Sequence, residues 1–310
     1  MKLSQLKAFL TTVKCGTFSE AALELDMSQS AVSYAVAELE KSLGVTLLNR
    51  GRGGASATEI GEEIASQARQ LFQTEETIRQ LASRAAGALR GTLHVLTFRS
   101  VASRVLPPIL SHLARHHEGL QVKLLETNGD HDDTARALHE GRVDLAFVQL
   151  PFSDDFLQWQ VLRDSYVVVR QKNQSRGKQV PHSVSWKELA ETPLILYGNH
   201  ESTAVIEQYL RAELGSIEPK YQVKEDSTLI RMVAEGLGLT LMPELAVESL
   251  PENVETAALP EPLERSIGIA VAPKALKMPA VRAFMRALRT KYPESAIPEL
   301  SSTAGTIEVT

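Results

Sequence analysis

Residues 16–44 constrain the fold of this chain more than any other segment, because they predict two short helices joined by a tight turn. In the first helix, small and large apolar residues recur with helical spacing, namely Phe18, Ala21, Ala22 and Leu25. In the second helix, the inward positions are Val32, Val36, Leu39 and Leu43. The small side chains of Ala21 and Ala22 allow the second helix to approach the first closely.

The second helix is expected to begin after Ser28, whose hydroxyl can accept a hydrogen bond from a free backbone N–H of the first turn. Small and polar residues then face outward, namely Gln29, Ser30, Ser33, Tyr34 and Ala37. A supported helix with such side chains at its N-terminal end is what reading of the DNA major groove requires. From these residues alone, an ordinary helical hairpin with a polar surface remains the alternative.

The segment after this pair predicts a small two-stranded wing over residues 45–57, turning through Gly51, Gly53 and Gly54. Arg50 and Arg52 make this wing locally basic, which suits contact with phosphates or the minor groove. The wider charge balance is weak: residues 1–58 hold six Lys and Arg against five Asp and Glu, and the chain carries a net charge of −5. We therefore expect modest non-specific affinity for DNA and a reliance on dimeric binding.

Thr58 is expected to cap a long helix over residues 59–86, which Gly87 and Gly91 end. Apolar residues recur in it every seven positions, at Ile64, Leu71, Ile78 and Ala85. Such a period indicates a partner helix along a seam, as in a coiled coil. The alternative is a surface helix packed on its own domain.

From residue 91 onward, predicted strands and helices alternate over about two hundred residues. This alternation favours parallel sheets covered by helices, and its length suits two lobes better than one. With 43% hydrophobic and 23% charged residues, the chain has the composition of a globular protein. No apolar run approaches the roughly 20 residues of a membrane span, and the N-terminus has no signal-peptide core, so we expect no membrane partner and a cytoplasmic location.

The N-terminal sixty residues resemble the signature of LysR-type transcriptional regulators. The matching positions are Leu6, Phe9, Gly16, Phe18, Ala21, Ala22, Leu25, Ser28, Gln29, Ser33, Leu39, Glu40, Leu43, Gly44, Leu47, Arg50, Thr58 and Gly61. The chain departs from the usual pattern at Ser30, Leu48 and Ala57, where the family often has proline, an aromatic residue and leucine. These departures concern the detail of the wing.

The resemblance continues in three later segments, Leu106-Pro107, residues 141–146 and the stretch from Gly236 to Pro243. It implies an α/β fold: an N-terminal winged helix-turn-helix (1–58), a long linker and dimerisation helix (59–90), and a two-lobe, periplasmic-binding-protein-like effector domain (91–293). Lobe 1 would comprise residues 91–163 and 266–293, and lobe 2 residues 164–265, before a loose tail over 294–310.

No motif for catalysis or for a cofactor is evident, so we expect neither an enzyme nor a bound cofactor or metal. His112 and His116 stand four residues apart on a helix, but no third ligand is evident, and a solvated helix end is the favoured interpretation. The polar group His131, Asp132 and Asp133 is explained by helix capping. Cys15, the only cysteine, is interpreted as a small half-buried residue rather than a thiol sensor.

An effector site is predicted where strands of an α/β sheet end and helices begin, because ligands bind in such crevices. Three loops and one strand end supply the candidates, Arg99, Ser100, Asn128, His131, Gln149, Asn199, His200 and Thr203. By the resemblance, Arg99, Ser100, His131 and Gln149 align with effector-contacting positions. Arg99 and His200 favour an anion, whereas the neighbouring aspartates disfavour one, and the effector's identity stays open.

Together, these features predict a bacterial, sequence-specific regulator that binds double-stranded promoter DNA and responds to a small-molecule effector. The resemblance implies a dimer, by default a dimer of dimers, and contact with RNA polymerase as a further partner. A solute-binding receptor without a transcriptional role is the main alternative. An enzyme built on the two-lobe region is a third hypothesis from another class.

Overall fold

The computed structural model describes residues 1–51, 54–127, 129–172, 183–198, 201–215, 218–247 and 249–298. Its N-terminal domain contains α1 (Leu3–Cys15), α2 (Phe18–Leu25), α3 (Gln29–Leu43) and an antiparallel wing of β1 (Leu48–Gly51) and β2 (Gly54–Ala57). The predicted cap is confirmed, because Ser28 Oγ accepts a hydrogen bond from Ala31 N at 3.2 Å. Val32, Val36 and Leu39 are fully buried, as predicted for this helix, whereas Leu43, also predicted to face inward, is 36% exposed at the end of α3.

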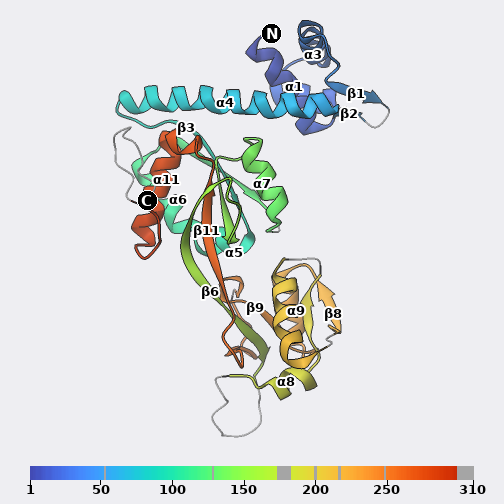
Figure 1. The fold of residues 1–310 in the computed structure, drawn as a ribbon, viewed down its shortest axis with the longest axis vertical. Coiled ribbons are helices and arrows are strands. Elements are labelled where there is room, and N and C mark those ends of the chain that lie inside the picture. Colours follow the sequence, from blue (N-terminus) through green and yellow to red (C-terminus); the bar gives the residue numbers. More distant parts are fainter. Residues whose placement is uncertain are drawn as a thin grey trace.

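The long helix α4 (Glu59–Ala85) begins at Thr58, whose side chain accepts from Gly61 N. Its start packs tightly against the wing segment: a Cβ at Gly61 would lie 2.2 Å from the Leu47 carbonyl oxygen. Figure 1 shows α4 running along the N-terminal domain at one end and across the C-terminal region at the other. It therefore connects the two parts of the molecule.

Lobe 1 is the half of the C-terminal region beside α4. It contains β3 (Gly91–Thr97), α5 (Arg99–Arg104), α6 (Leu106–His116), β4 (Leu120–Glu126), α7 (His131–His139) and β5 (Leu145–Leu150), and the last helix, α11 (Pro279–Lys291), returns to it. Its core gathers apolar side chains from α6, α11 and the sheet, including Ile109, Phe147 and Phe284. Aromatic edge-to-face packing joins Phe147 to Phe284, with ring centroids 6.3 Å apart.

Lobe 2 is the distal half. Its elements are α8 (Trp186–Glu191), β7 (Ile195–Tyr197), α9 (Glu201–Leu214), β8 (Tyr221–Val223), α10 (Asp226–Ala234), β9 (Thr240–Pro243), η1 (Glu244–Ala246) and β10 (Val254–Ala258). Two long strands, β6 (Leu157–Gln171) and β11 (Glu264–Val271), pair antiparallel and run between the lobes (Figure 1). A short turn, η2 (Ala275–Lys277), then leads from β11 into α11. The chain thus crosses between the lobes twice, on strands that include residues 162–164 and 265–266.

The strand directions correct one expectation. Strands β3, β4 and β5 are parallel, as are β7 and β8, but β11 and β6 pair antiparallel with each other and with their other neighbours. The sheets are mixed because the chain crosses between lobes on extended strands instead of returning through a helix. Strand β10 was not predicted.

The helical segment over residues 101–117 is interrupted. It is two helices, α5 and α6, which meet at Val105. Pro107 and Pro108 lack the N–H that a continuous helix would need, and proline is tolerated only in a first turn. Among the described residues, no helix is both long and apolar enough to cross a membrane.

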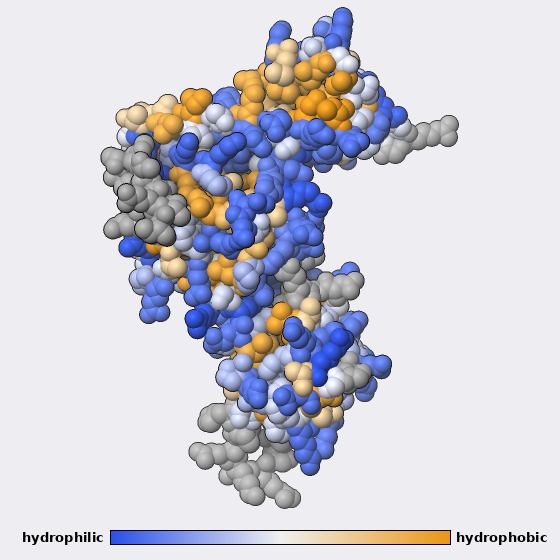
Figure 2. Space-filling model, in the orientation of Figure 1, coloured by the Kyte–Doolittle hydropathy of each residue, from blue (hydrophilic) through white to orange (hydrophobic). Residues whose placement is uncertain are grey.

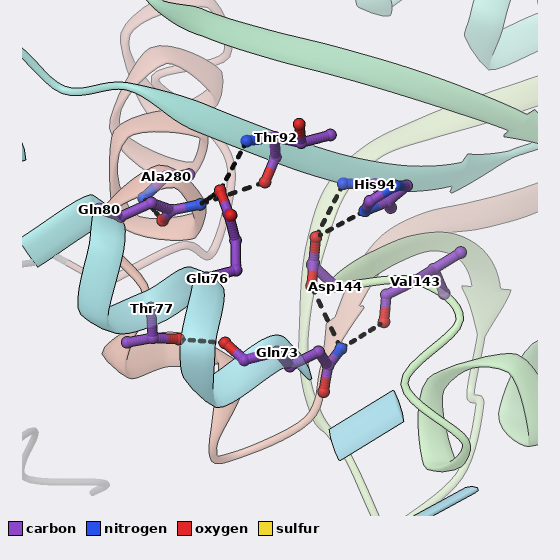
Figure 3. A network of polar contacts seen from close by, with 9 residues as sticks. All are labelled: Gln73, Glu76, Thr77, Gln80, Thr92, His94, Val143, Asp144 and Ala280. Atoms are coloured by element: carbon purple, nitrogen blue, oxygen red, sulfur yellow. Dashed lines mark hydrogen bonds and ion pairs between the residues drawn. The ribbon is translucent and has the colours of Figure 1, made fainter. Parts of the chain in front are cut away.

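Helix α4 is fastened to lobe 1 by a strip of polar side chains, of which Gln80 is buried and Gln73 and Glu76 are half-buried (Figure 3). Gln80, which has no exposed surface, donates to the Thr92 carbonyl at 3.1 Å and accepts from Ala280 N at 3.0 Å. Glu76 accepts from Thr92 N at 2.8 Å. Two turns earlier than Gln80, Gln73 donates to Asp144 Oδ1 at 3.2 Å. The strip thus joins α4 to β3, to the start of β5 and to the start of α11.

Candidate DNA-binding surface and effector cavity

The N-terminal end of α3 presents a row of accessible side chains. Gln29, Ser30 and Ala37 are exposed, Ser33 is half-buried, and Tyr34 is 69% exposed. The opposite face of α3 packs against α1 and α2, which hold the helix in place. The five predicted residues therefore share one accessible face, as reading of base edges requires.

Arg50 has a structural role that the sequence did not reveal. Its guanidinium pairs with Glu40 of α3 at 2.8 Å and lies over the Phe18 ring, 5.3 Å from the centroid. The other oxygen of Glu40 accepts from Leu47 N at 2.8 Å. Glu40 and Arg50 thus fix the wing relative to α3, and 45% of the Arg50 side chain stays exposed. Arg52, the other predicted basic contact, lies outside the described residues.

A cavity of about 680 Å³ lies between the lobes. Lobe 1 lines it with residues from the ends of β3, β4 and β5 and from the start of α7, and lobe 2 with residues around β7, α10 and β9. Of the predicted effector contacts, Arg99, Ser100, His131 and Gln149 all line this cavity. The volume is that of a small-molecule site.

At the crossover, Arg265 lines the cavity and forms a buried ion pair with Asp164. Arg265 and Asp164 are 7% and 3% exposed, and Arg265 Nη2 lies 2.7 Å from Asp164 Oδ2. The same nitrogen donates to Ser100 Oγ at 3.1 Å, and the guanidinium lies over the Phe98 ring. Asp164 also accepts from Leu245 N at 3.0 Å. This group ties both crossover strands to α5.

A second set of contacts spans the cavity mouth. Arg99 of α5 pairs with Glu225 at 2.5 Å, and Asp226 lies 3.8 Å from the same nitrogen. Asp226 in turn accepts a short hydrogen bond of 2.5 Å from the Tyr197 hydroxyl. Burial and the adjacent Asp226 carboxylate raise the pKa of Tyr197 well above its ordinary value, so its hydroxyl stays protonated. Lobe 1 and lobe 2 are therefore joined by a charged contact.

The remaining predicted effector residues fall elsewhere. Thr203 does not line the cavity, and its hydroxyl donates to the Tyr197 carbonyl at 2.9 Å. Asn128, Asn199 and His200 lie outside the described residues. The sequence reasoning missed Arg265, Tyr197 and Asp226. Tyr197 lies at a strand end and Asp226 at a helix start. The rule that ligands bind where strands end and helices begin could therefore have predicted both residues.

The other polar candidates have structural roles. Asp130 caps α7 by accepting from Asp133 N at 2.8 Å, and Asp133 itself pairs with Arg136. His112 and His116 stack with centroids 4.2 Å apart. In the described ranges, no three His, Cys, Asp or Glu side chains are placed to hold a metal ion.

Cys15 is half-buried, and its thiol lies 3.4 Å from Glu24 Oε2. Burial, followed by the Glu24 carboxylate, raises the pKa of the thiol above its ordinary value. A thiol with a raised pKa forms less of the reactive thiolate, which agrees with a structural residue.

Large apolar side chains are exposed mainly at the N-terminal end of the molecule. Among the described residues, eleven of thirteen such side chains lie within the first 81 positions. Figure 2 shows apolar residues gathered over the N-terminal domain. On α4, Leu71 is 38% and Ile78 61% exposed, whereas Ile64 packs into the N-terminal core. Part of the predicted heptad row is thus available to a partner.

Comparison with known families and structures agrees with this architecture. Residues 3–62 match the family described as "Bacterial regulatory helix-turn-helix protein, lysR family", and residues 86–293 match "LysR substrate binding domain". The chain is 40% identical to the probable HTH-type transcriptional regulator LrrA of Synechococcus elongatus, over 95% of this chain and 98% of LrrA. It is 28% identical to the regulator IlvY of Escherichia coli, over 93% and 99% of the two chains.

Solved structures share the fold. A full-length variant of OxyR from Pseudomonas aeruginosa superposes with a TM-score of 0.71 at 22% identity, covering 93% of this chain and 95% of OxyR. CbnR complexed with its target DNA gives 0.65 at 19% identity, covering 94% and 99%. The chain therefore belongs to the LysR family, and it is a DNA-binding transcriptional regulator with an effector-binding region.

Proposed function

We propose that this regulator reads promoter DNA through α3, with Gln29, Ser30, Ser33, Tyr34 and Ala37 facing the major groove. The accessible row on α3 supports this assignment, because its opposite face is fully used in packing. Arg52 and the exposed part of Arg50 would contact the backbone from the wing. The chain would act in the cytoplasm, where promoter DNA lies.

The effector would occupy the cavity between the lobes and carry one anionic group. The observation that supports this class is the guanidinium of Arg265: its Nε and Nη2 are engaged, but in the described part of the chain its Nη1 makes no hydrogen bond. Those N–H groups, with the Ser100 hydroxyl beside them, form a recognition point for a carboxylate. Glu126 and Asp130 also line the cavity, which disfavours a ligand with several negative charges.

A ligand in this position would contact both lobes. It would therefore change the relative populations of the open and closed arrangements of the two lobes. The ligand would either compete with Glu225 and Asp226 for Arg99 or bind while this ion pair stays in place. Lobe 1 is joined to α4 through Gln73, Glu76 and Gln80, so its reorientation would reach the N-terminal domains. Effector and DNA binding would thus be coupled in the sense of linked equilibria.

We further propose the domain division 1–58, 59–90 and 91–293, with dimerisation along α4. Leu71, Ile78 and the exposed Ala85 lie seven residues apart, and their exposure supports a helix–helix seam. In this proposal two such dimers associate into a tetramer, and the assembly contacts RNA polymerase.

The experiment combines a thermal-shift screen of metabolites on the full chain with a gel-shift assay on DNA from upstream of its own gene. A monocarboxylate that stabilises the protein and changes the gel shift supports the proposal. A ligand that stabilises the protein while no DNA is bound in any condition would favour the solute-binding alternative.

A further inference from the structure

A second cationic cluster lies outside the effector cavity, where the end of α4 meets α11. Three arginines define it, Arg84 on α4 and Arg282 and Arg286 on α11, and we call it the arginine triad. The helices are held together beside it by the hydrogen bond of 3.0 Å from Ala280 N to Gln80 Oε1. Arg84 is one turn beyond Gln80, and Arg282 and Arg286 lie on successive turns of one face of α11.

Arg282 is 6% exposed, and its Nε is buried without a hydrogen-bond partner. In the part of the chain that the structure describes, none of the three arginines takes part in an ion pair. By contrast, Arg170 and Arg265, which are also well buried, each pair with carboxylates. The triad is therefore a group of like charges at a helix junction, with one member almost entirely removed from water.

The charges of Arg282 and Arg84 act on Arg286, which lies partly exposed on α11. Burial, and then the charges of Arg282 and Arg84, lower the pKa of Arg286 below its ordinary value. Among the described residues, no carboxylate is one of the groups that influence this pKa. Burying a cation without a counter-ion is costly, because the protein interior does not replace the hydration that the charge loses. An anion that fills the place of the missing partner would relieve this cost.

We propose that the arginine triad binds a small oxyanion of the phosphate type, at a site separate from the effector cavity. Arginine presents planar forks of N–H donors that match phosphate oxygens, and three cations favour a dianion over a monocarboxylate. The bound anion would bridge α4 and α11, the same junction that Gln80 fastens. It would stiffen the connection between the linker helix and lobe 1 independently of the cavity ligand.

The test is titration of the full chain with inorganic phosphate at constant ionic strength, followed by calorimetry and by thermal unfolding. We expect saturable binding to the wild-type chain and a rise in its unfolding temperature. Arg282→Met and Arg286→Gln should each weaken binding by about tenfold or more, since each removes a charge-assisted contact. The matched control is Arg211→Gln, which removes one exposed arginine of lobe 2 that pairs with Glu207, and it should bind phosphate like the wild type.

A second readout separates ligand binding from a purely structural role. Without phosphate, Arg282→Met should be at least as stable as the wild type, because it removes a buried charge that has no ion-pair partner among the described residues. If Arg282→Met does not fold, Arg286→Gln decides alone, because that side chain is exposed. A parallel titration with glycerol phosphate identifies the source: tighter binding than inorganic phosphate indicates a phosphorylated metabolite, and equal binding indicates the free ion. Absence of saturable binding of either compound, or unchanged affinity in both variants, would overturn the proposal.

Discussion

Replacing Gln80 by leucine should loosen the junction between α4 and lobe 1 without changing the volume of the side chain much. The amide of Gln80 donates to the Thr92 carbonyl and to Glu76, and accepts from Ala280 N, all at 3.0–3.1 Å and with no exposed surface. Leucine can make none of these bonds. The buried N–H of Ala280, in the first turn of α11, would lose its partner.

The magnitude follows from these contacts. A stranded buried N–H costs about 1–3 kcal/mol, and each of the other lost neutral bonds contributes about 1 kcal/mol. The added apolar burial of leucine offsets part of this loss, so we expect a net destabilisation of about 2–3 kcal/mol. For a domain of this size the unfolding temperature should fall by about 4–12 °C. If the junction opens locally, protection of the first amides of α11 against hydrogen exchange should fall by about 30- to 150-fold.

Hydrogen exchange of the full chain, read on peptides that cover the start of α11, is the assay. Gln67→Leu is the matched control, because Gln67 is exposed on the same helix. Unchanged protection in Gln80→Leu would refute the reasoning, as would an equal change in the control. Either result would mean that the polar strip in Figure 3 does not fasten the helix.

The remaining predictions concern the cavity, the crossover and the dimer. Ser100→Ala or Gln149→Ala should raise the effector concentration that gives half response by about one to two decades, since a lost buried hydrogen bond costs about 1–3 kcal/mol. Effector-free operator affinity should hardly change, and unchanged midpoints would place the ligand elsewhere. Arg265→Met should lower the free energy of unfolding by about 3–5 kcal/mol, because it leaves the Asp164 carboxylate buried without its partner. Adding Asp164→Leu to this variant should recover most of the loss. A double variant that loses the sum of the two single effects would contradict this expectation. Leu71→Glu should yield monomers or loose dimers in sedimentation, whereas an unchanged dimer would place the seam elsewhere.

Local patterns explain why much of the fold could be predicted. The helix pair of the N-terminal domain rests on contacts within one short segment, and Ser28 and Thr58 cap the helices that they were expected to cap. The last helix, Pro279–Lys291, belongs to the alternation of strands and helices that was predicted from residue 91 onward. The four cavity residues that were derived from strand ends and alignment also lie together.

The missing parts depend on contacts between distant segments. Asp164 and Arg265 lie on the two strands that cross between the lobes, and their pairing over 101 residues is a property of these antiparallel strands. Gln73, Glu76 and Gln80 have the composition of a solvated helix face. They pack against lobe 1 because the backbone of β3, the start of α11 and Asp144 supply their hydrogen-bond partners. No periodicity in the sequence predicts a hydrogen-bond partner from so distant a segment.

Reading of base edges by α3 is tested by comparing the affinities of two proteins for two DNA duplexes. Fluorescence anisotropy should compare the wild type and Gln29→Ala on DNA from upstream of the gene and on a scrambled duplex of the same length. The account predicts a loss of about 1–3 kcal/mol, or about 5- to 150-fold, on the upstream DNA. Affinity for the scrambled duplex should change by less than about twofold, because phosphate contacts supply that binding. Equal weakening on both duplexes would contradict the assignment of α3 to the major groove.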